Sequence, residues 1–392
     1  MKSLPLYILR IALVGFNFFI SLLITNVLGI DTFGMISWTI SVAFIVAVIS
    51  CFGLENIIYR DLYKRGIAFI IGNCLALTVA IYLILFLILN ISDQLNIAFI
   101  AIGIIVNRIF SNIMKVLGKT YYFMLIENGS IALSLFLAFT ITQIMEGVFF
   151  SNFISMFYLV VSIHGIVVYR AYSVMANQSS FCANAKESAF SYKAIKHRAS
   201  LFFATFIGIA SSESYIFIGG LSLSNSMLGI LSWVAKLSSF YEFPQNILNT
   251  KYSKEFSEQK THIGIIFRKS LAEYQKVAKL LILLLPIFIY TPVLVVTELN
   301  KFMPHLGVIF TCICLIIYMG PTGLYFVRSN HVYMYNKVLY FSLLIVLITS
   351  ITIVFISKNQ SLIFIVLSIF PYFQALIYTL ILRIIMKKME LK

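Results

Sequence analysis

The stretch FGMISW at residues 33–38 has a near copy, LGILSW at 228–233, and this repeat sets the organisation of the whole chain. Glycine, serine and tryptophan match outright, and the other three positions are apolar in both copies. The copies hold the only two tryptophans, Trp38 and Trp233, and start 195 residues apart in a chain of 392. A match that uses both tryptophans and falls at half the chain length rarely arises by chance, so we infer two homologous halves.

The composition is that of a membrane protein. Apolar residues make up 61% of the chain, charged residues only 11%, and the mean hydropathy is +0.98. A soluble chain of this length cannot bury that much apolar surface in one core. A membrane-spanning helix needs about 20 apolar residues, and twelve stretches qualify: 4–28, 33–58, 66–90, 95–117, 121–144, 148–169, 200–221, 226–249, 277–297, 303–327, 338–357 and 361–385. We therefore predict an all-α polytopic membrane protein with about twelve transmembrane helices.

The repeat fixes the predicted domain organisation. Six spans per half return the chain to the side on which it began, so the second half repeats the first with parallel topology. We predict an N-terminal six-helix bundle at 1–175, a polar and basic cytoplasmic linker at 176–198, and a C-terminal six-helix bundle at 199–392.

The net charge of +15 follows the topology. Lysine and arginine gather in the loops on the side of the N-terminus, whereas the predicted outer loops hold only Lys301 and Lys358. This asymmetry is the positive-inside rule, and it places both termini in the cytoplasm. The excess charge is thereby explained without a nucleic-acid partner. We expect the first span to be an uncleaved helix, because no small-residue cleavage site follows it.

No pattern of enzyme chemistry stands out. The sequence shows no nucleophile–base pair and no phosphate-cradling glycine loop, and a membrane polymerase or ligase would carry a large outer loop that this chain lacks. We therefore expect a non-enzyme with no catalytic residue, no cofactor and no metal. Five cysteines lack metal-ligand spacing and are interpreted as structural filler: Cys51, Cys74, Cys182, Cys312 and Cys314.

Three charged residues lie deepest in the predicted spans: Arg108, Glu213 and Lys236. A charge at mid-span costs about 2.5–3.5 kcal/mol on insertion scales. We expect Arg108 and Lys236 to line a polar cavity and attract an anionic substrate, because arginine offers bidentate donors to phosphate. Glu213 is expected to bind a coupling ion or proton. The alternative is that Glu213 pairs with Lys236 as a structural ion pair.

The first span supplies two further candidates for substrate binding, Arg10 and Asn17. Asn17, Ser21 and Thr25 are four residues apart and share one helix face, which we expect to face a bundle interior or a wet cavity. Arg10 lies near the inner surface, where it either snorkels to headgroups or docks an anionic lipid headgroup.

Other polar residues are weaker candidates. Glu127 is a second ion-coupling candidate, although Glu127 and Glu242 are both within snorkelling range of the inner surface. Arg60 ends the second span and is a gate candidate, but positive-inside topology alone explains its place. Interfacial anchoring explains Trp38 and Trp233 near the outer ends of their spans.

Several short stretches resemble one family. Residues 28–34 after the first span, with 53–54 and Arg60 closing the second, look like the opening of Wzx-type polysaccharide flippases. These belong to the multidrug/oligosaccharidyl-lipid/polysaccharide (MOP) exporter superfamily. The short inner turn at 116–120 and the basic stretch leading into an apolar run at 268–286 are also similar.

The resemblance implies two six-helix bundles, of the kind seen in MATE exporters, around a cavity that opens alternately to each side. The substrate would be a polyprenyl-pyrophosphate-linked oligosaccharide for O-antigen or a similar polysaccharide, flipped from the cytoplasmic to the periplasmic leaflet of the bacterial inner membrane. The resemblance also implies that transport is coupled to an ion or to the membrane potential. The implied partners are membrane lipid, a polysaccharide polymerase and a chain-length regulator. The alternative is a MATE-like multidrug or cation antiporter, which would carry a more acidic site in its first bundle; Arg108 favours an anionic substrate.

Overall fold

The protein is all-helical in the part that the computed structural model describes. The described residues are 4–54, 58, 75–91, 95–116, 120–144, 199, 202, 206, 213–258, 263–287, 289–290, 296–322, 325–326, 332–357 and 359–390. The chain forms two compact units, one of Met1–Leu28 with Trp38–Glu213 and one of Gly29–Ser37 with Ser214–Lys392. The predicted domain bounds stay a prediction, because the linker at 176–198 lies outside the described residues.

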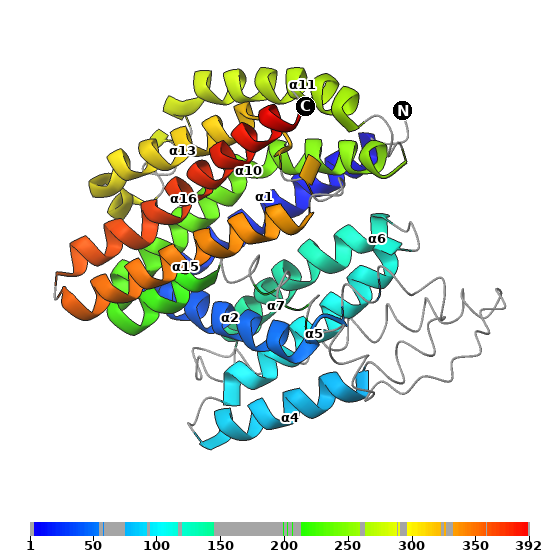
Figure 1. The fold of residues 1–392 in the computed structure, drawn as a ribbon. Helices are drawn as coiled ribbons and strands as arrows, with labels where there is room; N and C mark the ends of the chain where they lie inside the picture. Colours follow the sequence, from blue (N-terminus) through cyan, green and yellow to red (C-terminus); the bar gives the residue numbers. More distant parts are fainter. Residues whose placement is uncertain are drawn as a thin grey trace, which may run out of the picture. The chain divides into compact units, whose positions relative to one another are not determined.

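The first unit is built from helices that follow one another along the chain. Its described elements are α1 (Leu4–Leu28), α2 (Ile30–Cys51) from Trp38 onward, α4 (Leu75–Ile91), α5 (Leu95–Val116), α6 (Thr120–Met124), the π-helical turn η2 (Leu125–Gly129) and α7 (Ser130–Ile144). Helix α1 packs on α7 and η2, and α5 packs on α4 and α6 (Figure 1). Between α1 and α2 the chain turns at Gly29, whose φ of 87° is a left-handed conformation that glycine adopts without strain.

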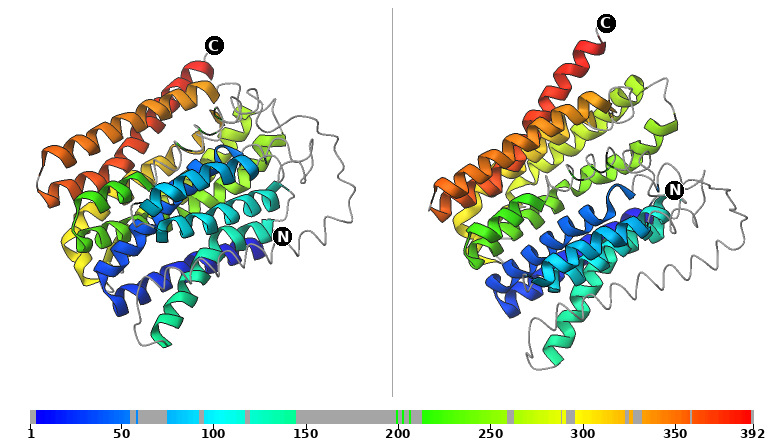
Figure 2. Two further views of the ribbon diagram at one scale, coloured as in Figure 1. Left: turned by 90° about the horizontal axis from the view of Figure 1, so that it is seen from below. Right: turned by 60° about the horizontal axis from the view of Figure 1, so that its bottom comes forward.

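The second unit contains longer helices. Its described elements are the N-terminal part of α2, a helical segment at 214–222, α10 (Asn225–Glu258), α11 (Ile263–Leu283), the 3-10 helix η4 (Thr297–Phe302), α13 (Met303–Tyr318), α15 (Val332–Ile356) and α16 (Gln360–Glu390). Helix α13 packs on both α11 and α16, α15 lies along α16, and α10 contacts α11, α13 and α16 (Figures 1 and 2).

The helices match the predicted spans. Six described helices are long and apolar enough to cross a membrane. Every predicted span coincides with helix in whole or in part, except 148–169, which lies outside the described residues. Large apolar side chains on α15 are exposed at helical spacing, namely Phe341, Ile345, Ile348 and Phe355. A stripe of this kind is a liability in water and is normal where a helix faces lipid.

Within the second unit, Gly34 on α2 and Gly229 on α10 bring two helix backbones into direct contact. A Cβ atom added to Gly34 would lie 2.5 Å from the Asn225 carbonyl oxygen and 2.6 Å from the Gly229 nitrogen. A Cβ atom added to Gly229 would collide with the Ile30 carbonyl oxygen. Ile30 and Asn225 are equivalent positions of the repeat, as are the two glycines, so the contact is the same from either helix. Small residues permit such close helix approach in membranes.

The two tryptophans of the repeat have different surroundings. Trp233 is completely buried, and its ring centroid lies 5.3 Å from that of Phe33. Trp38 is half-buried. The prediction of interfacial anchoring is therefore wrong for Trp233. This side chain lies one helical turn after Gly229 and is packed inside the second unit.

Candidate functional site

A charged cluster in the first unit joins three elements. The Ser41 hydroxyl on α2 donates a hydrogen bond to the Glu213 carboxylate. The Arg108 guanidinium on α5 acts electrostatically on the same carboxylate. Opposite charges that lie close together offset part of the cost of burying each one. Within the first unit, Arg108 is thus the opposite charge that acts on Glu213. The alternative pairing of Glu213 with Lys236, a residue of the second unit, stays a prediction.

Arg108 belongs to a polar strip on α5. Its carbonyl oxygen accepts hydrogen bonds from the Asn112 amide at 2.7 Å and the Ser111 hydroxyl at 3.2 Å. Asn107 and Ser111 are buried, while Arg108 itself is half-buried. Side chains that bond to carbonyls one turn back satisfy their own polar groups inside a helix bundle. Arg108 is therefore flanked by polar side chains on a helix whose other residues are mostly apolar.

The polar face of α1 lies in the interior of the first unit. The Ser21 hydroxyl donates to the Asn17 carbonyl oxygen and the Thr25 hydroxyl to the Ser21 carbonyl oxygen, both at 2.8 Å. Ser21 and Thr25 are buried and Asn17 is half-buried. The sequence predicted that this face lies in a bundle interior or in a wet cavity. Ser21 and Thr25 lie in the bundle interior, and their hydroxyl groups bond to carbonyl oxygens of their own helix.

Glu127 lies in the π-helical turn Leu125–Gly129. Such turns are frequent at functional sites, because the extra residue widens the helix and redirects side chains. The turn packs on α1, where a Cβ atom on Gly129 would come within 3.2 Å of Leu13. The side chains of Glu127 and Arg10 lie outside the described part, as does the whole of Arg60, so the roles of these three residues stay predictions.

Lys236 lies in the second unit, in the first half of α10 and near the middle of the predicted span 226–249. Its ammonium nitrogen lies 5.6 Å from the centroid of the Phe33 ring, a cation–π geometry. The same ring contacts Trp233. Position 236 is the repeat equivalent of position 41, so the two halves place a lysine and a serine at matching points of α10 and α2.

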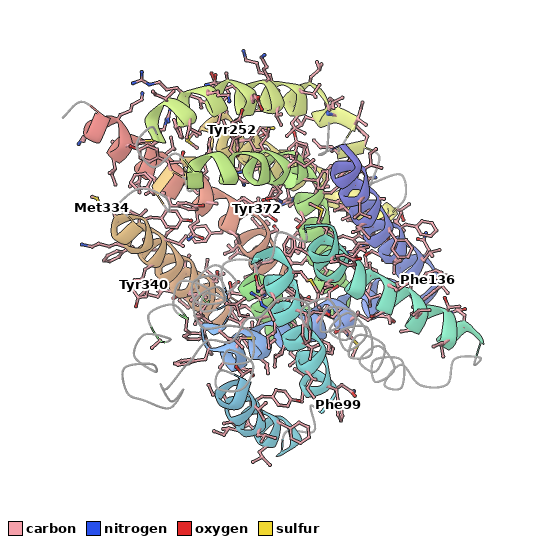
Figure 3. All side chains as sticks on the ribbon, turned by 90° about the vertical axis from the view of Figure 1, so that its right-hand side faces the viewer. Phe99, Phe136, Tyr252, Met334, Tyr340 and Tyr372 are labelled. Carbon is pink, nitrogen blue, oxygen red and sulfur yellow. The ribbon has the colours of Figure 1, made fainter. Side chains whose placement is uncertain are left out.

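A group of hydroxyls lies near Glu242 in the second unit. The hydroxyl of Tyr372 on α16, the residue labelled in Figure 3, shares side-chain hydrogen bonds with Ser238 on α10 and Tyr215 on the 214–222 helix. Glu242 follows Ser238 by one turn and acts electrostatically on Tyr372 and Tyr378. Helix α10 continues beyond Glu242 to Glu258 and packs on α16. Snorkelling of Glu242 to the inner surface stays a prediction. In the sequence, the feature that points to this group is the pair Tyr372 and Tyr378 in the predicted span 361–385.

Among the described residues, no group of three or more His, Cys, Asp or Glu side chains gathers as metal ligands would.

Comparison with solved structures identifies the fold. The structure of the MATE multidrug transporter DinF-BH, solved as a ligand complex, is similar with a TM-score of 0.64 at 14% identity, over 96% of this chain and 93% of that one. The chain has the MATE transporter fold. An inward-facing multidrug resistance MATE family transporter of the MOP superfamily gives a TM-score of 0.52 at 10% identity, over 97% and 99% of the two chains. A crystal structure of MATE in complex with MaL6 gives 0.52 at 12%, over 100% and 94%.

The MATE fold confirms the predicted fold class, an all-α polytopic protein with about twelve helices in two bundles. The protein is a multi-pass membrane protein. Two of these neighbours are described as transporters, and the expectation that this chain is not an enzyme stays a prediction. The sequence itself matches no protein-family profile and no curated protein.

Proposed function

We propose that the protein is a flippase with the MATE fold that moves a polyprenyl-pyrophosphate-linked oligosaccharide from the cytoplasmic to the periplasmic leaflet by alternating access. The fold supports a transporter of the MOP superfamily. The observation that carries the substrate class is Lys236, a cation near the middle of the predicted span 226–249 that lies over an aromatic ring. A cation in this position attracts phosphate and repels the positively charged drugs that a cation antiporter carries.

Arg108 supports the same substrate class. A guanidinium group has five N–H donors and cannot lose its charge, so pairing with one carboxylate leaves donors for phosphate oxygens. In this proposal Glu213 holds Arg108 in position and takes part in ion coupling. Arg10 and Asn17 complete the substrate contacts, Glu127 is a second coupling residue, and Arg60 gates the cytoplasmic mouth. A polymerase and a chain-length regulator would use the flipped product.

A MATE-like multidrug or cation antiporter is the second candidate. The solved structures that share the fold include two described as multidrug transporters. The acids Glu213 and Glu242 would serve cation exchange in that case. The two candidates differ in the charge of the transported headgroup, which is positive for the antiporter and negative for the flippase.

The decisive experiment is the sidedness of lipid-linked oligosaccharide in cells that lack the gene. Accumulation on the cytoplasmic leaflet, with loss of surface polysaccharide, supports the flippase. Accumulation of single repeat units on the periplasmic leaflet would indicate a polymerase, and no accumulation on either side would favour the antiporter.

The role of Lys236 is tested by complementing those cells with variants. Lys236→Gln should lower flipping about tenfold or more, since a charge-assisted hydrogen bond is worth about 1.5–3 kcal/mol. Lys236→Arg should retain most activity, and Lys276→Gln, which removes an exposed lysine of α11, is the matched control. Full flipping by Lys236→Gln at normal protein level would remove Lys236 from the substrate path.

A further inference from the structure

The exposed face of α16 changes from apolar to basic along its length. Ile377, Leu380 and Ile384 are exposed and recur at helical spacing, so they form one stripe on the helix. The stripe continues into Lys387 and Lys388, which are also exposed. An apolar stripe that ends in lysines is typical of a lipid-facing helix at the level where the hydrocarbon meets the headgroups. The last turns of α16 therefore mark that level on the predicted cytoplasmic side.

Helix α11 shows the same change in the opposite chain direction. Its first part has the exposed cations Arg268, Lys276 and Lys279. The exposed positions Leu283 and Ile287, which follow Lys279 at helical spacing, are apolar. A basic start on α11 and a basic end on α16 are what two antiparallel helices show when both cross one headgroup level.

A contact between the two helices joins these basic parts. The guanidinium carbon of Arg383 on α16 lies 4.5 Å from the centroid of the Phe267 ring on α11, a cation–π geometry. The end of α16 lies beside α11 (Figure 1). Phe267 is completely buried, and its ring meets that of Tyr325 edge-on. Arg268 follows Phe267 in the chain and Lys387 follows Arg383 by one helical turn, so the contact gathers cations from two helices.

The charge around this contact is strongly one-sided. Helix α11 and residues 383–390 of α16 together contain seven basic residues and two acidic residues. The basic residues are Arg268, Lys269, Lys276, Lys279, Arg383, Lys387 and Lys388, and the acidic residues are Glu273 and Glu390. Positive-inside topology explains an excess of cations on this side. It does not require a guanidinium group stacked on a buried ring where two helices meet. The excess complements an anionic headgroup, and the apolar stripes beside it complement acyl chains.

We propose that the basic parts of α11 and α16 form a binding site for the headgroup of an anionic phospholipid, with Arg268, Arg383 and Lys387 attracting its phosphate. Arginine and lysine give phosphate oxygens charge-assisted hydrogen bonds. Each cation at the surface of an anionic membrane strengthens such binding roughly fivefold. A lipid held in this way would bridge two helices of the second unit. The proposal goes beyond the transport function and does not depend on the transported substrate.

Lipid binding can be measured on the purified full-length protein in a neutral detergent. Phosphatidylglycerol is titrated while thermal unfolding reports its binding, and phosphatidylcholine is titrated in parallel as the lipid without net charge. We expect phosphatidylglycerol to stabilise the wild-type protein at lower concentration. Arg268→Gln and Lys387→Gln should each weaken the apparent affinity for phosphatidylglycerol roughly fivefold. The matched control is Lys301→Gln, which removes an exposed lysine of η4 in a predicted outer loop and should change nothing.

Three results would overturn the proposal. The first is equal stabilisation of the wild-type protein by the two phospholipids. The second is an unchanged phosphatidylglycerol affinity in Arg268→Gln and Lys387→Gln. The third is an equal loss in Lys301→Gln, which would mean that net charge alone sets the affinity.

Arg383→Gln is the variant with the greatest expected loss of lipid affinity, and it also removes the contact with the buried Phe267 ring. A fall in its unfolding temperature without lipid is therefore expected, and the quantity compared is the lipid concentration at half of the full shift. Arg268 and Lys387 are exposed, so their variants keep the test valid even if Arg383→Gln fails to fold.

A polyprenyl pyrophosphate also carries phosphate on a lipid chain, so it is titrated as a third ligand. If Arg268→Gln and Lys387→Gln weaken its binding and leave phosphatidylglycerol binding unchanged, the site takes the transported lipid and the proposal fails. If phosphatidylglycerol binds as expected to a protein that flips no oligosaccharide, the proposed function fails and the phospholipid site stands.

Discussion

Helices α2 and α10 are equivalent elements of the two halves, and they combine a shared scaffold with different charge chemistry. Both carry the glycine, serine and tryptophan of the repeat, and their glycines meet each other. One helical turn beyond the tryptophan, α2 has Ser41, which bonds the Glu213 carboxylate next to Arg108, whereas α10 has Lys236 over an aromatic ring. Among the described residues, Glu213 of the first unit lies near the opposite charge of Arg108, whereas Lys236 of the second unit lies over the Phe33 ring. Duplication preserved the packing and let the polar chemistry diverge.

The largest expected effect concerns the two tryptophans. Trp233→Ala should lower the free energy of unfolding by about 3–5 kcal/mol, because it removes a completely buried ring and leaves a cavity. Trp38→Ala should cost clearly less, since Trp38 is half-buried. Thermal unfolding in detergent, with fluorescence of the remaining tryptophan as the probe, measures both. Equal losses would contradict the different packing of the two copies.

The second effect tests the charge pair of the first unit. Arg108→Met leaves the Glu213 carboxylate without its compensating charge and should destabilise the protein by about 2 kcal/mol, a value reduced from that of a fully buried pair because Arg108 is half-buried. Adding Glu213→Gln should recover most of the loss. Membrane abundance and thermal unfolding are the readouts. If Lys236→Met gave the same loss and Glu213→Gln rescued it too, the contrast between the units would disappear.

The glycine crossing should give the third effect. Gly34→Ala and Gly229→Ala each force backbone atoms apart and should cost about 1–2 kcal/mol. Gly15→Ala and Gly264→Ala are the controls, because an added Cβ meets nothing within 4 Å at either site and alanine favours the helix. The double variant at the crossing should lose less than the sum of the singles, since the first alanine already separates the helices. Additive losses would mean that the two glycines act independently.

The smallest effect concerns the ring beneath Lys236. Phe33→Leu should cost about 0.5–2 kcal/mol, the range of a cation–π contact, together with part of the Trp233 packing. A double-mutant cycle with Lys236→Met isolates the cation–π part through thermal unfolding. A coupling energy of zero would show that Phe33 stabilises the protein only through its packing on Trp233.

Sequence patterns predicted where the helices lie better than they predicted which residues of separate helices come together. Hydropathy and the repeat placed the spans and the fold, because a membrane helix must satisfy its backbone within itself and its length is set by the bilayer. The grouping of 29–37 with the second unit and the π-helical turn at 125–129 have no periodic signal. The closeness of Arg108 to Glu213 depends on how separate helices pack, which local spacing does not encode. The same holds for Glu242 and Tyr372, which lie on α10 and α16.

The contact between Gly34 and Gly229 also bears on the ancestry of the chain. Each helix offers the other the same surface, with Gly34 against Asn225 and Gly229 against Ile30, which is the isologous arrangement of a two-fold homodimer. Matching surfaces of this kind are expected of two copies of one duplicated half. Either glycine can change only if the other helix makes room, so the two positions are expected to vary together.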